Sequence, residues 1–406
     1  MSRLVSLLIV LLAIAVATPV LAEQRLSLSG QMRVRGYYTD GPGFDTDAKS
    51  TSTFNQRLRL FGNIAAAEGV SVHFRQDFST GTWDESKGTP STSTRPEAWL
   101  NVDKGMFNIK AGRMYYRIGN AIVADHVAGG AVFTLKGAVP VEFAYFKLEE
   151  NDVAKDDDLD FYTLAVRHKT DMYNAVVFGG LLRDGGSPTN TTKSSTYAVG
   201  TQANFKLDPV NINFEANYFT GEEDISGGEK YRGLQVFTDI GMKVTETVNA
   251  GLILAYAKGY DDKVQVSNLT NDAYANGAGR SNGIFMPETN GFFTAGFTPL
   301  YRSNNQIFRI SHSATASAGS RLVQGYVRAK VMDPLSVHMN VGYGQPDEKI
   351  GTDYVKSITY ANISSRYQLA ARTNLDTVYS YAKPKVNGTL EDDAKQILAF
   401  NLNVNF

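Results

Sequence analysis

The chain has 406 residues but no cysteine, only two tryptophans and only five histidines. The absence of cysteine excludes disulfide-stabilised domains, thiolate zinc sites, iron–sulfur clusters, covalent haem attachment and cysteine nucleophiles. Neither sign of charge is in excess, since 40 Lys and Arg stand against 41 Asp and Glu. A nucleic-acid-binding protein normally has a basic excess, so we expect no nucleic-acid partner.

Long apolar runs are also scarce, and the one long run lies at the N-terminus. Arg3 precedes an apolar run over residues 4–16, and small residues ending at Ala22 follow it. This order is typical of a secretory signal peptide and predicts residues 1–22 as the signal, cleaved after Ala22. The alternative is a membrane anchor, but the run is short for the ~20 residues of a spanning helix. Residues 23–406 would then be exported across the inner membrane.

The rest of the chain alternates apolar and polar residues. The final segment is the clearest case: Leu398, Phe400, Leu402, Val404 and Phe406 alternate with Ala399, Asn401, Asn403 and Asn405. A period of two predicts β-strands with one apolar and one polar face. The same pattern recurs over residues 26–38, 70–78, 210–218, 234–244 and 335–343. No helical period of ordinary length interrupts it, which disfavours a βα enzyme fold.

Short and long connections alternate along the chain. Short links with turn-forming residues lie at 68–69, 103–105, 137–140, 169–171, 208–209, 245–247, 333–334 and 371–373. Longer polar links lie at 39–52, 80–94, 117–130, 149–158, 184–194, 221–231, 261–319, 345–353 and 384–393. Eight turns and nine loops predict about eighteen strands, with sixteen as the alternative. The segments between them reach the ~9 to 11 residues of a transmembrane strand.

These patterns predict an all-β fold, a transmembrane antiparallel β-barrel in a Gram-negative outer membrane. Its short turns would be periplasmic and its long loops extracellular. A closed barrel leaves no unpaired edge in hydrocarbon, and its polar strand faces would line a water-filled interior. The alternative is a large periplasmic β-sandwich or β-helix. Aromatic residues near the predicted strand ends suit interfacial girdles: Tyr37, Tyr38, Tyr115, Tyr116, Tyr218, Phe219, Tyr343 and Tyr381.

The sequence resembles the Gram-negative porins. The signal segment, the amphipathic strands and the terminal strand ending on Phe406 are similar to theirs, and residues 107–120, FNIKAGRMYYRIGN, resemble their fifth strand. The resemblance implies that Phe406 is read by the outer-membrane assembly machinery and that lipid and lipopolysaccharide surround the barrel. Eighteen strands resemble the substrate-specific porins more than the sixteen-stranded general ones. Porins commonly form homotrimers, but eighteen-stranded members also occur as monomers, so both states stay open.

Basic residues gather on the predicted inward face of the first strands. They are Arg33, Arg35, Arg57, Arg59, Arg75 and Lys110, with Asp77 and Glu97 as inward acidic residues that would partly neutralise them. Adjacent strands lie ~4.8 Å apart, so these side chains should form one patch on the wall of the interior. Such a patch attracts anions, and Arg suits carboxylate, sulfate or phosphate. The alternative is a set of structural cross-strand ion pairs.

The link at 117–130, RIGNAIVADHVAGG, is too apolar for an exposed outer loop. In porins the third loop folds into the barrel, and the resemblance implies a constriction here that carries Arg117, Asp125 and His126. The alternative is an outer loop packed on its neighbours. Arg113 falls out of phase with Lys110 unless a bulge intervenes. The longest link, 261–319, is predicted to be an extracellular loop that forms an ordered cap or a second constriction.

The leading functional hypothesis is passive diffusion of small hydrophilic solutes through a water-filled channel, biased towards anions. The alternatives are a non-conducting scaffold, such as a cytochrome sheath, and a barrel-embedded lipid hydrolase. The five histidines show no H-x-x-x-H spacing, and no carboxylate cluster accompanies His126, so we expect no metal, no cofactor and no enzyme activity. A hydrolase would need a Ser/His pair with an orienting residue, which distant strands could assemble.

Overall fold

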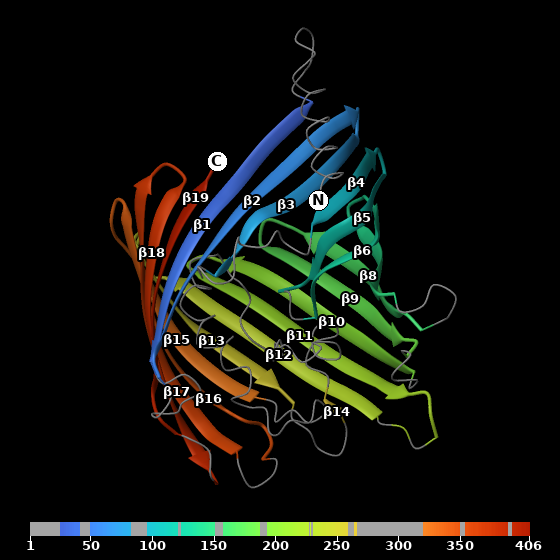
Figure 1. Cartoon of the computed structure of the whole chain (residues 1–406). Helices are drawn as coiled ribbons and strands as arrows, with labels where there is room; N and C mark the ends of the chain where they lie inside the picture. Colours follow the sequence, from blue (N-terminus) through green and yellow to red (C-terminus); the bar gives the residue numbers. More distant parts are fainter. Residues whose placement is uncertain are drawn as a thin grey trace.

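The computed structural model describes residues 25–40, 49–82, 96–120, 123–150, 157–186, 193–226, 228, 230–258, 264–265, 320–349, 354–388 and 392–406. These residues form one closed, antiparallel β-barrel (Figure 1). The predicted signal segment lies outside the described residues, as does the link 261–319 apart from residues 264–265. No described residue belongs to a helix long and apolar enough to cross a membrane.

Eighteen long strands build the barrel wall. They are β1 (Leu26–Asp40), β2 (Thr51–Ala67), β3 (Val70–Thr82), β4 (Glu97–Lys104), β5 (Phe107–Ile118), β6 (Ala124–Leu135), β7 (Val141–Glu149), β8 (Leu159–Lys169), β9 (Tyr173–Asp184), β10 (Ser194–Leu207), β11 (Val210–Glu223), β12 (Lys230–Lys243), β13 (Val248–Ala257), β15 (Ser320–Met332), β16 (Leu335–Gln345), β17 (Tyr354–Ala370), β18 (Thr373–Asn387) and β19 (Lys395–Asn405). The two-residue β14 (Val264–Gln265) pairs parallel with β12. The prediction of eighteen strands is confirmed, and the alternative of sixteen is wrong.

The barrel closes between its first and last strands. β1 pairs with β2 on one side and with β19 on the other, so both of its edges are hydrogen-bonded. In Figure 1 the blue β1 lies beside the red β19, with the C-terminus next to it. Closure satisfies the backbone groups that an open sheet would leave exposed at its edges.

The alternation of short and long connections is also confirmed. Each of the eight predicted turns joins two consecutive antiparallel strands, for example residues 68–69 between β2 and β3 and residues 208–209 between β10 and β11. Eight of the nine longer links join strands at the opposite end of the barrel, whereas the link predicted over 117–130 belongs to a hairpin that folds inwards. An even number of strands therefore leaves the first and last strands to begin and end on the side of the short turns.

The two faces of the wall have the reverse polarity of a water-soluble protein. Large apolar side chains are exposed on the outer face, among them Leu164, Val177 and Val199, which are 54%, 57% and 63% exposed. Polar side chains are buried on the inner face, as Gln202 and Glu215 show. This arrangement fits a barrel surrounded by lipid, with its polar groups around an inner channel.

The eight aromatic residues expected in the girdles divide between the two faces. Tyr38, Tyr218, Tyr343 and Tyr381 are exposed on the outer face. The prediction is wrong for Phe219 and Tyr116, which are buried inside the barrel, because Tyr116 lies on the hairpin of β5 and β6 that folds inwards and Phe219 belongs to the buried cluster that it joins.

Candidate functional site

One hairpin of the barrel leaves the wall. The ladder between β4 and β5 ends at Arg113, and the ladder between β6 and β7 begins only at Gly129. Between these points, residues 114–118 of β5 and 124–128 of β6 pair with each other alone. We call this segment the inner hairpin.

The inner hairpin lies inside the barrel and packs on the inner face of the strands that follow it, β7 to β11. The hydroxyl of Tyr116 lies 2.7 Å from the Thr163 hydroxyl of β8. At the tip, Asn120 donates its backbone N–H to Glu215 of β11 at 2.5 Å. Its side-chain amide pairs reciprocally with Asn213, at 3.0 Å in each direction. Because β11 is six strands away from β5, these contacts require the tip to lie inside the barrel.

Apolar packing holds the same face of the hairpin against the wall. Ile118 and Val123, on either side of the tip, are fully buried. The Tyr116 ring packs 4.8 Å from the ring of Phe146 on β7. These residues belong to one buried cluster that includes Phe161, Phe178 and Phe219 on β8, β9 and β11. The hairpin and the wall therefore form two packed sheet layers, as in a small β-sandwich.

The expectation of a loop over 117–130 is wrong in its secondary structure. β5 continues to Ile118 and β6 begins at Ala124, so the link shrinks to residues 119–123, of which 121–122 lie outside the described residues. Arg117 lies in β5, and its backbone pairs with that of Asp125 in β6. His126 pairs with Tyr116 in the same way. The side chains of Asp125 and His126 lie outside the description, whereas Arg117 is exposed.

The first two strands carry three basic side chains that have no acidic partner among the described residues. Arg33 of β1 is directly opposite Arg57 of β2, and Arg35 follows on the same face. Arg57 donates to the Gln31 Oε1 at 2.5 Å, and Arg35 donates to the Tyr37 hydroxyl at 3.0 Å. None of the three forms an ion pair with a side chain in the described part of the chain. We call Arg33, Arg35 and Arg57 the unpaired basic cluster.

The next two basic residues are neutralised. Arg59 holds Asp77 of β3 with two hydrogen bonds, of 2.5 and 2.8 Å. Arg59 and Asp77 are direct cross-strand partners, and the ladder shifts by one residue just beyond them, between Arg59 and Leu58. Arg75 forms an ion pair with Glu97 of β4. The basic patch predicted on the inner wall is therefore divided into two parts. Arg59 and Arg75 form ion pairs with Asp77 and Glu97, whereas Arg33, Arg35 and Arg57 do not.

Lys110 lies on β5, opposite Asn101 of β4, and is exposed. Two residues further on, Gly112 has a φ of +131° at the point where β5 begins to leave β4. The Glu97 carboxylate accepts the backbone N–H of Tyr115, which lies just beyond this departure. The inner face of β4 therefore supports the base of the inner hairpin.

Among the described residues, Ser71 and His73 form a Ser–His contact on the inner face. Ser71 Oγ lies 2.9 Å from His73 Nε2, and the His73 ring stacks on Trp99 at 5.1 Å. No carboxylate of the described residues orients this histidine, so the pair lacks the third member of a hydrolase triad. Among the described residues there is also no group of three or more His, Asp or Glu that could hold a metal ion.

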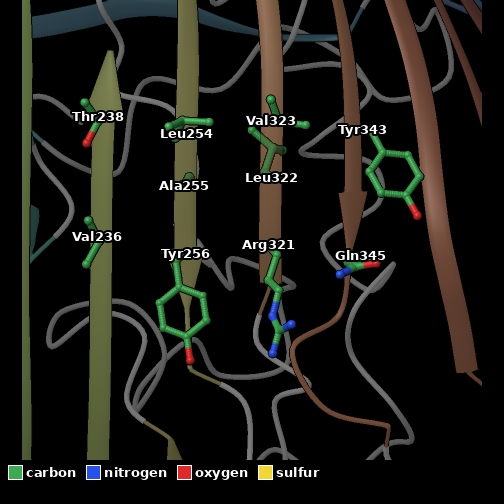
Figure 2. A pocket seen from close by; sticks show the side chains of 10 residues that line it. All are labelled: Val236, Thr238, Leu254, Ala255, Tyr256, Arg321, Leu322, Val323, Tyr343 and Gln345. Atoms are coloured by element: carbon green, nitrogen blue, oxygen red, sulfur yellow. The ribbon is translucent and has the colours of Figure 1, made fainter. Parts of the chain in front are cut away.

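A separate hollow of about 370 Å³ lies along β12, β13, β15 and β16 (Figure 2). Leu254, Val323 and Tyr343 in its lining belong to the exposed apolar outer face. Its charged member, Arg321, donates to Asp347 at 2.6 and 2.8 Å. This hollow therefore faces away from the channel, and its cation already has an acidic partner.

The sequence did not predict that the inner face of β11 contacts the hairpin. Asn213 and Glu215 were visible only as polar positions of an alternating strand, and nothing in that alternation distinguishes a residue that contacts a hairpin from one that contacts water. On another part of the wall, the Tyr326 hydroxyl donates to Asp239 at 2.8 Å, and Arg328 lies 4.6 Å above the Tyr326 ring. The contact between Tyr326 and Asp239 also joins strands far apart in the sequence, whereas Arg328 lies on the same strand as Tyr326.

Several solved structures from Pseudomonas aeruginosa share this architecture. OpdL is 12% identical, with a TM-score of 0.58 over 94% of this chain and 98% of OpdL. OccK2 (OpdF) in complex with glucuronate is 10% identical, with a TM-score of 0.59 over 94% of this chain and 98% of that protein. OpdK with vanillate is 11% identical, with a TM-score of 0.55 over 94% of this chain and 99% of that protein.

No protein-family model and no curated protein sequence matches the chain. The likeness to the solved structures therefore concerns the fold. The chain has the eighteen-stranded barrel fold of the substrate-specific outer-membrane porins.

Proposed function

We propose that this protein is an outer-membrane porin that lets small hydrophilic solutes diffuse through the barrel, with a preference for anions. The observation that carries the proposal is the unpaired basic cluster on the inner face of a closed barrel whose outer face is apolar. Cations without acidic partners raise the local concentration of anions in a channel. The same barrel fold occurs in proteins solved with glucuronate and with vanillate.

Carboxylates are the solute class that this cluster fits best. Both glucuronate and vanillate carry a carboxylate group, and guanidinium groups bind carboxylates through paired hydrogen bonds. Arg33 and Arg57 are directly opposite on neighbouring strands, so both guanidinium groups can approach one anion. Arg59 and Arg75 contribute less attraction, because Asp77 and Glu97 neutralise them.

The inner hairpin is the proposed constriction. It packs on the inner face of β7 to β11. We infer that solutes pass along the side of β1 to β3. A wall of arginines facing a rigid hairpin would select solutes by both charge and size. This role replaces the apolar loop expected over 117–130, and it still includes Arg117.

The proposed location is the outer membrane, reached by export with cleavage after Ala22. The exposed apolar outer face requires lipid around the barrel, and Phe406 at the end of β19 is the proposed recognition signal for the assembly machinery. Lipopolysaccharide would surround the outer leaflet side. Whether the barrel acts alone or as a homotrimer is decided by its mass in detergent.

Planar bilayers test the proposed function. We expect stepwise conductance from the purified protein. In a salt gradient, the sign of the reversal potential should show that anions are more permeant than cations. Glucuronate and a neutral sugar of similar size should differ in permeation, with glucuronate the faster. Silent bilayers would favour a non-conducting scaffold, such as a cytochrome sheath, and lipid hydrolysis by the folded barrel would favour the enzyme.

A further inference from the structure

The tip of the inner hairpin is held by a carboxylate that faces no solute. The Glu215 side chain is fully buried. It accepts hydrogen bonds from the Asn120 backbone N–H at 2.5 Å and from the Asn217 Nδ2 at 2.9 Å. No Lys or Arg of the described residues pairs with it. Burying a carboxylate with only neutral donors costs free energy, because the carboxylate loses its hydrogen bonds to water. The hydrogen bonds from Asn120 and Asn217 must therefore compensate for that loss.

The tip is shaped around this carboxylate. Gly119 has a φ of +59°, a conformation that side chains disfavour. A Cβ at Gly119 would lie 2.7 Å from the Glu215 Oε2, so a larger residue could not approach as closely. Next to it, Asn213 forms the reciprocal amide pair with Asn120 and also accepts from the Gln202 side chain at 3.2 Å. Two strands, β10 and β11, and the turn of the inner hairpin therefore meet at one polar anchor.

The anchor also determines which hairpin face meets the solute path. Met114, Tyr116 and Ile118 point to the wall of β7 to β11 and are buried. Successive side chains of a strand point to opposite sides, so Tyr115 and Arg117 point away from that wall, and both are exposed. In a hairpin that stayed in the barrel wall, the same face would meet lipid, where Arg117 would be unfavourable. Folding inwards turns this face towards the channel.

We propose that Glu215, supported by Asn213, is the positioning residue of the constriction. It fixes the hairpin tip on β11 and so keeps Tyr115 and Arg117 turned into the solute path. This inference rests on the proposed function, since a constriction has meaning only in a channel. Arg117 then adds a second basic element to the solute path, and both the aperture and the selectivity depend on a residue that touches no solute.

Thiol labelling tests the positioning role without any measurement of transport. The wild-type chain has no cysteine, so Val123→Cys introduces the only thiol, at a fully buried position beside the tip. We expect slow reaction with a water-soluble maleimide in the folded barrel. Adding Glu215→Ala should speed the reaction by about tenfold, the effect of losing about 1.4 kcal/mol of tip attachment. Adding Glu215→Gln, which keeps an acceptor for the Asn120 N–H, should restore most of the protection.

A matched control removes a similar contact elsewhere on the inner wall. Asn340 of β16 accepts from Asn362 of β17 at 2.6 Å and is buried to a similar degree, without any contact to the hairpin. Asn340→Ala should leave the labelling of Val123→Cys unchanged. Each variant is first checked for a heat-modifiable, folded barrel, so that global misfolding is separated from release of the tip.

Single-channel recording then measures the consequence for the channel. Glu215→Ala should increase the open-state current noise, and Arg117→Gln should shift the reversal potential towards cations. In the Glu215→Ala background the shift from Arg117→Gln should fall to less than about half, because the released hairpin no longer holds residue 117 in the path. If Glu215 had a purely structural role, Glu215→Ala would lower the stability of the barrel but would leave the effect of Arg117→Gln on the reversal potential unchanged.

The outcomes separate the two proposals. Equal labelling of Val123→Cys with and without Glu215→Ala overturns the positioning role, whether or not the barrel conducts. The positioning role is also overturned if Arg117→Gln shifts the reversal potential by the same amount with and without Glu215→Ala. A wild-type barrel that does not conduct, but whose labelling depends on Glu215, overturns the proposed function and leaves the anchor of the hairpin established.

Discussion

Gly30 and Phe406 close the barrel by exchanging both of their backbone hydrogen bonds. Gly30 N–H donates to the Phe406 carbonyl at 2.7 Å, and Phe406 N–H donates to the Gly30 carbonyl at 3.0 Å. The Phe406 ring lies directly over Gly30, where a Cβ would be 2.4 Å from a ring carbon. The last residue of the chain therefore completes the seam between β1 and β19, with its ring on the outer face, which is why its loss should matter for assembly.

Deletion of Phe406 should lower the yield of folded barrel, because the seam loses two backbone hydrogen bonds and the ring above Gly30. Each hydrogen bond contributes about 1 kcal/mol. Phe406→Asp should be more harmful than a neutral substitution, because it places a charge beside lipid, at a cost of up to about 1 kcal/mol near the interface. The heat-modifiable band on gels measures folding, and wild-type levels for both variants would contradict this placement of the C-terminus.

Leu58→Arg should impair folding, because Leu58 lies on the outer face between Met32 and Ser79. A charge facing hydrocarbon costs up to about 2–4 kcal/mol. Arg57→Gln, one residue away on the inner face, should fold normally. Urea-induced unfolding in detergent or vesicles compares the two variants. The reverse result, with Leu58→Arg stable and Arg57→Gln unfolded, would mean that the two faces of β2 are exchanged.

Arg57→Gln and Arg59→Gln should have different effects, although the residues share one strand face. Removing the unpaired Arg57 should reduce the anion-to-cation permeability ratio by about a factor of two, with stability preserved. Removing Arg59 leaves the buried Asp77 without its two hydrogen bonds and should destabilise the barrel by about 1–3 kcal/mol. Reversal potentials and unfolding curves measured on both variants check this division. Equal effects on selectivity and stability would argue against it.

The anion preference should depend strongly on salt. The Debye length falls from about 10 Å at 0.1 M salt to about 3 Å at 1 M, so the unpaired basic cluster acts across less of the channel at high salt. Reversal potentials taken at a constant concentration ratio, but at rising mean concentration, should approach the non-selective value. In the Arg33→Gln/Arg57→Gln variant the preference should already be weak at low salt. A preference that is independent of salt would indicate selection by close contact rather than by the long-range potential.

Local physics in the sequence was sufficient for the architecture. A two-residue period can only place alternate side chains on opposite faces, and turn-forming residues such as Asp208-Pro209 mark where a strand must reverse. Counting these signals predicted the eighteen strands and all eight turns. The alternation placed Arg59 and Asp77 on the inner faces of neighbouring strands, and the pairing register of β2 and β3 then set them directly opposite each other.

The inner hairpin, in contrast, was decided by tertiary structure. The apolar residues around Ile118 and Val123 indicated that this segment needs burial, but the sequence carries no signal for the surface that provides it. That surface comes from β7 to β11, up to about a hundred residues later in the chain, and its anchor at Glu215 appears in the sequence as one more polar residue of an alternating strand. A period of two assigns a side chain to a face. Only closure of the barrel determines what lies opposite that face, and only the departure of β5 from β4 turns Arg117 from the lipid side to the channel side.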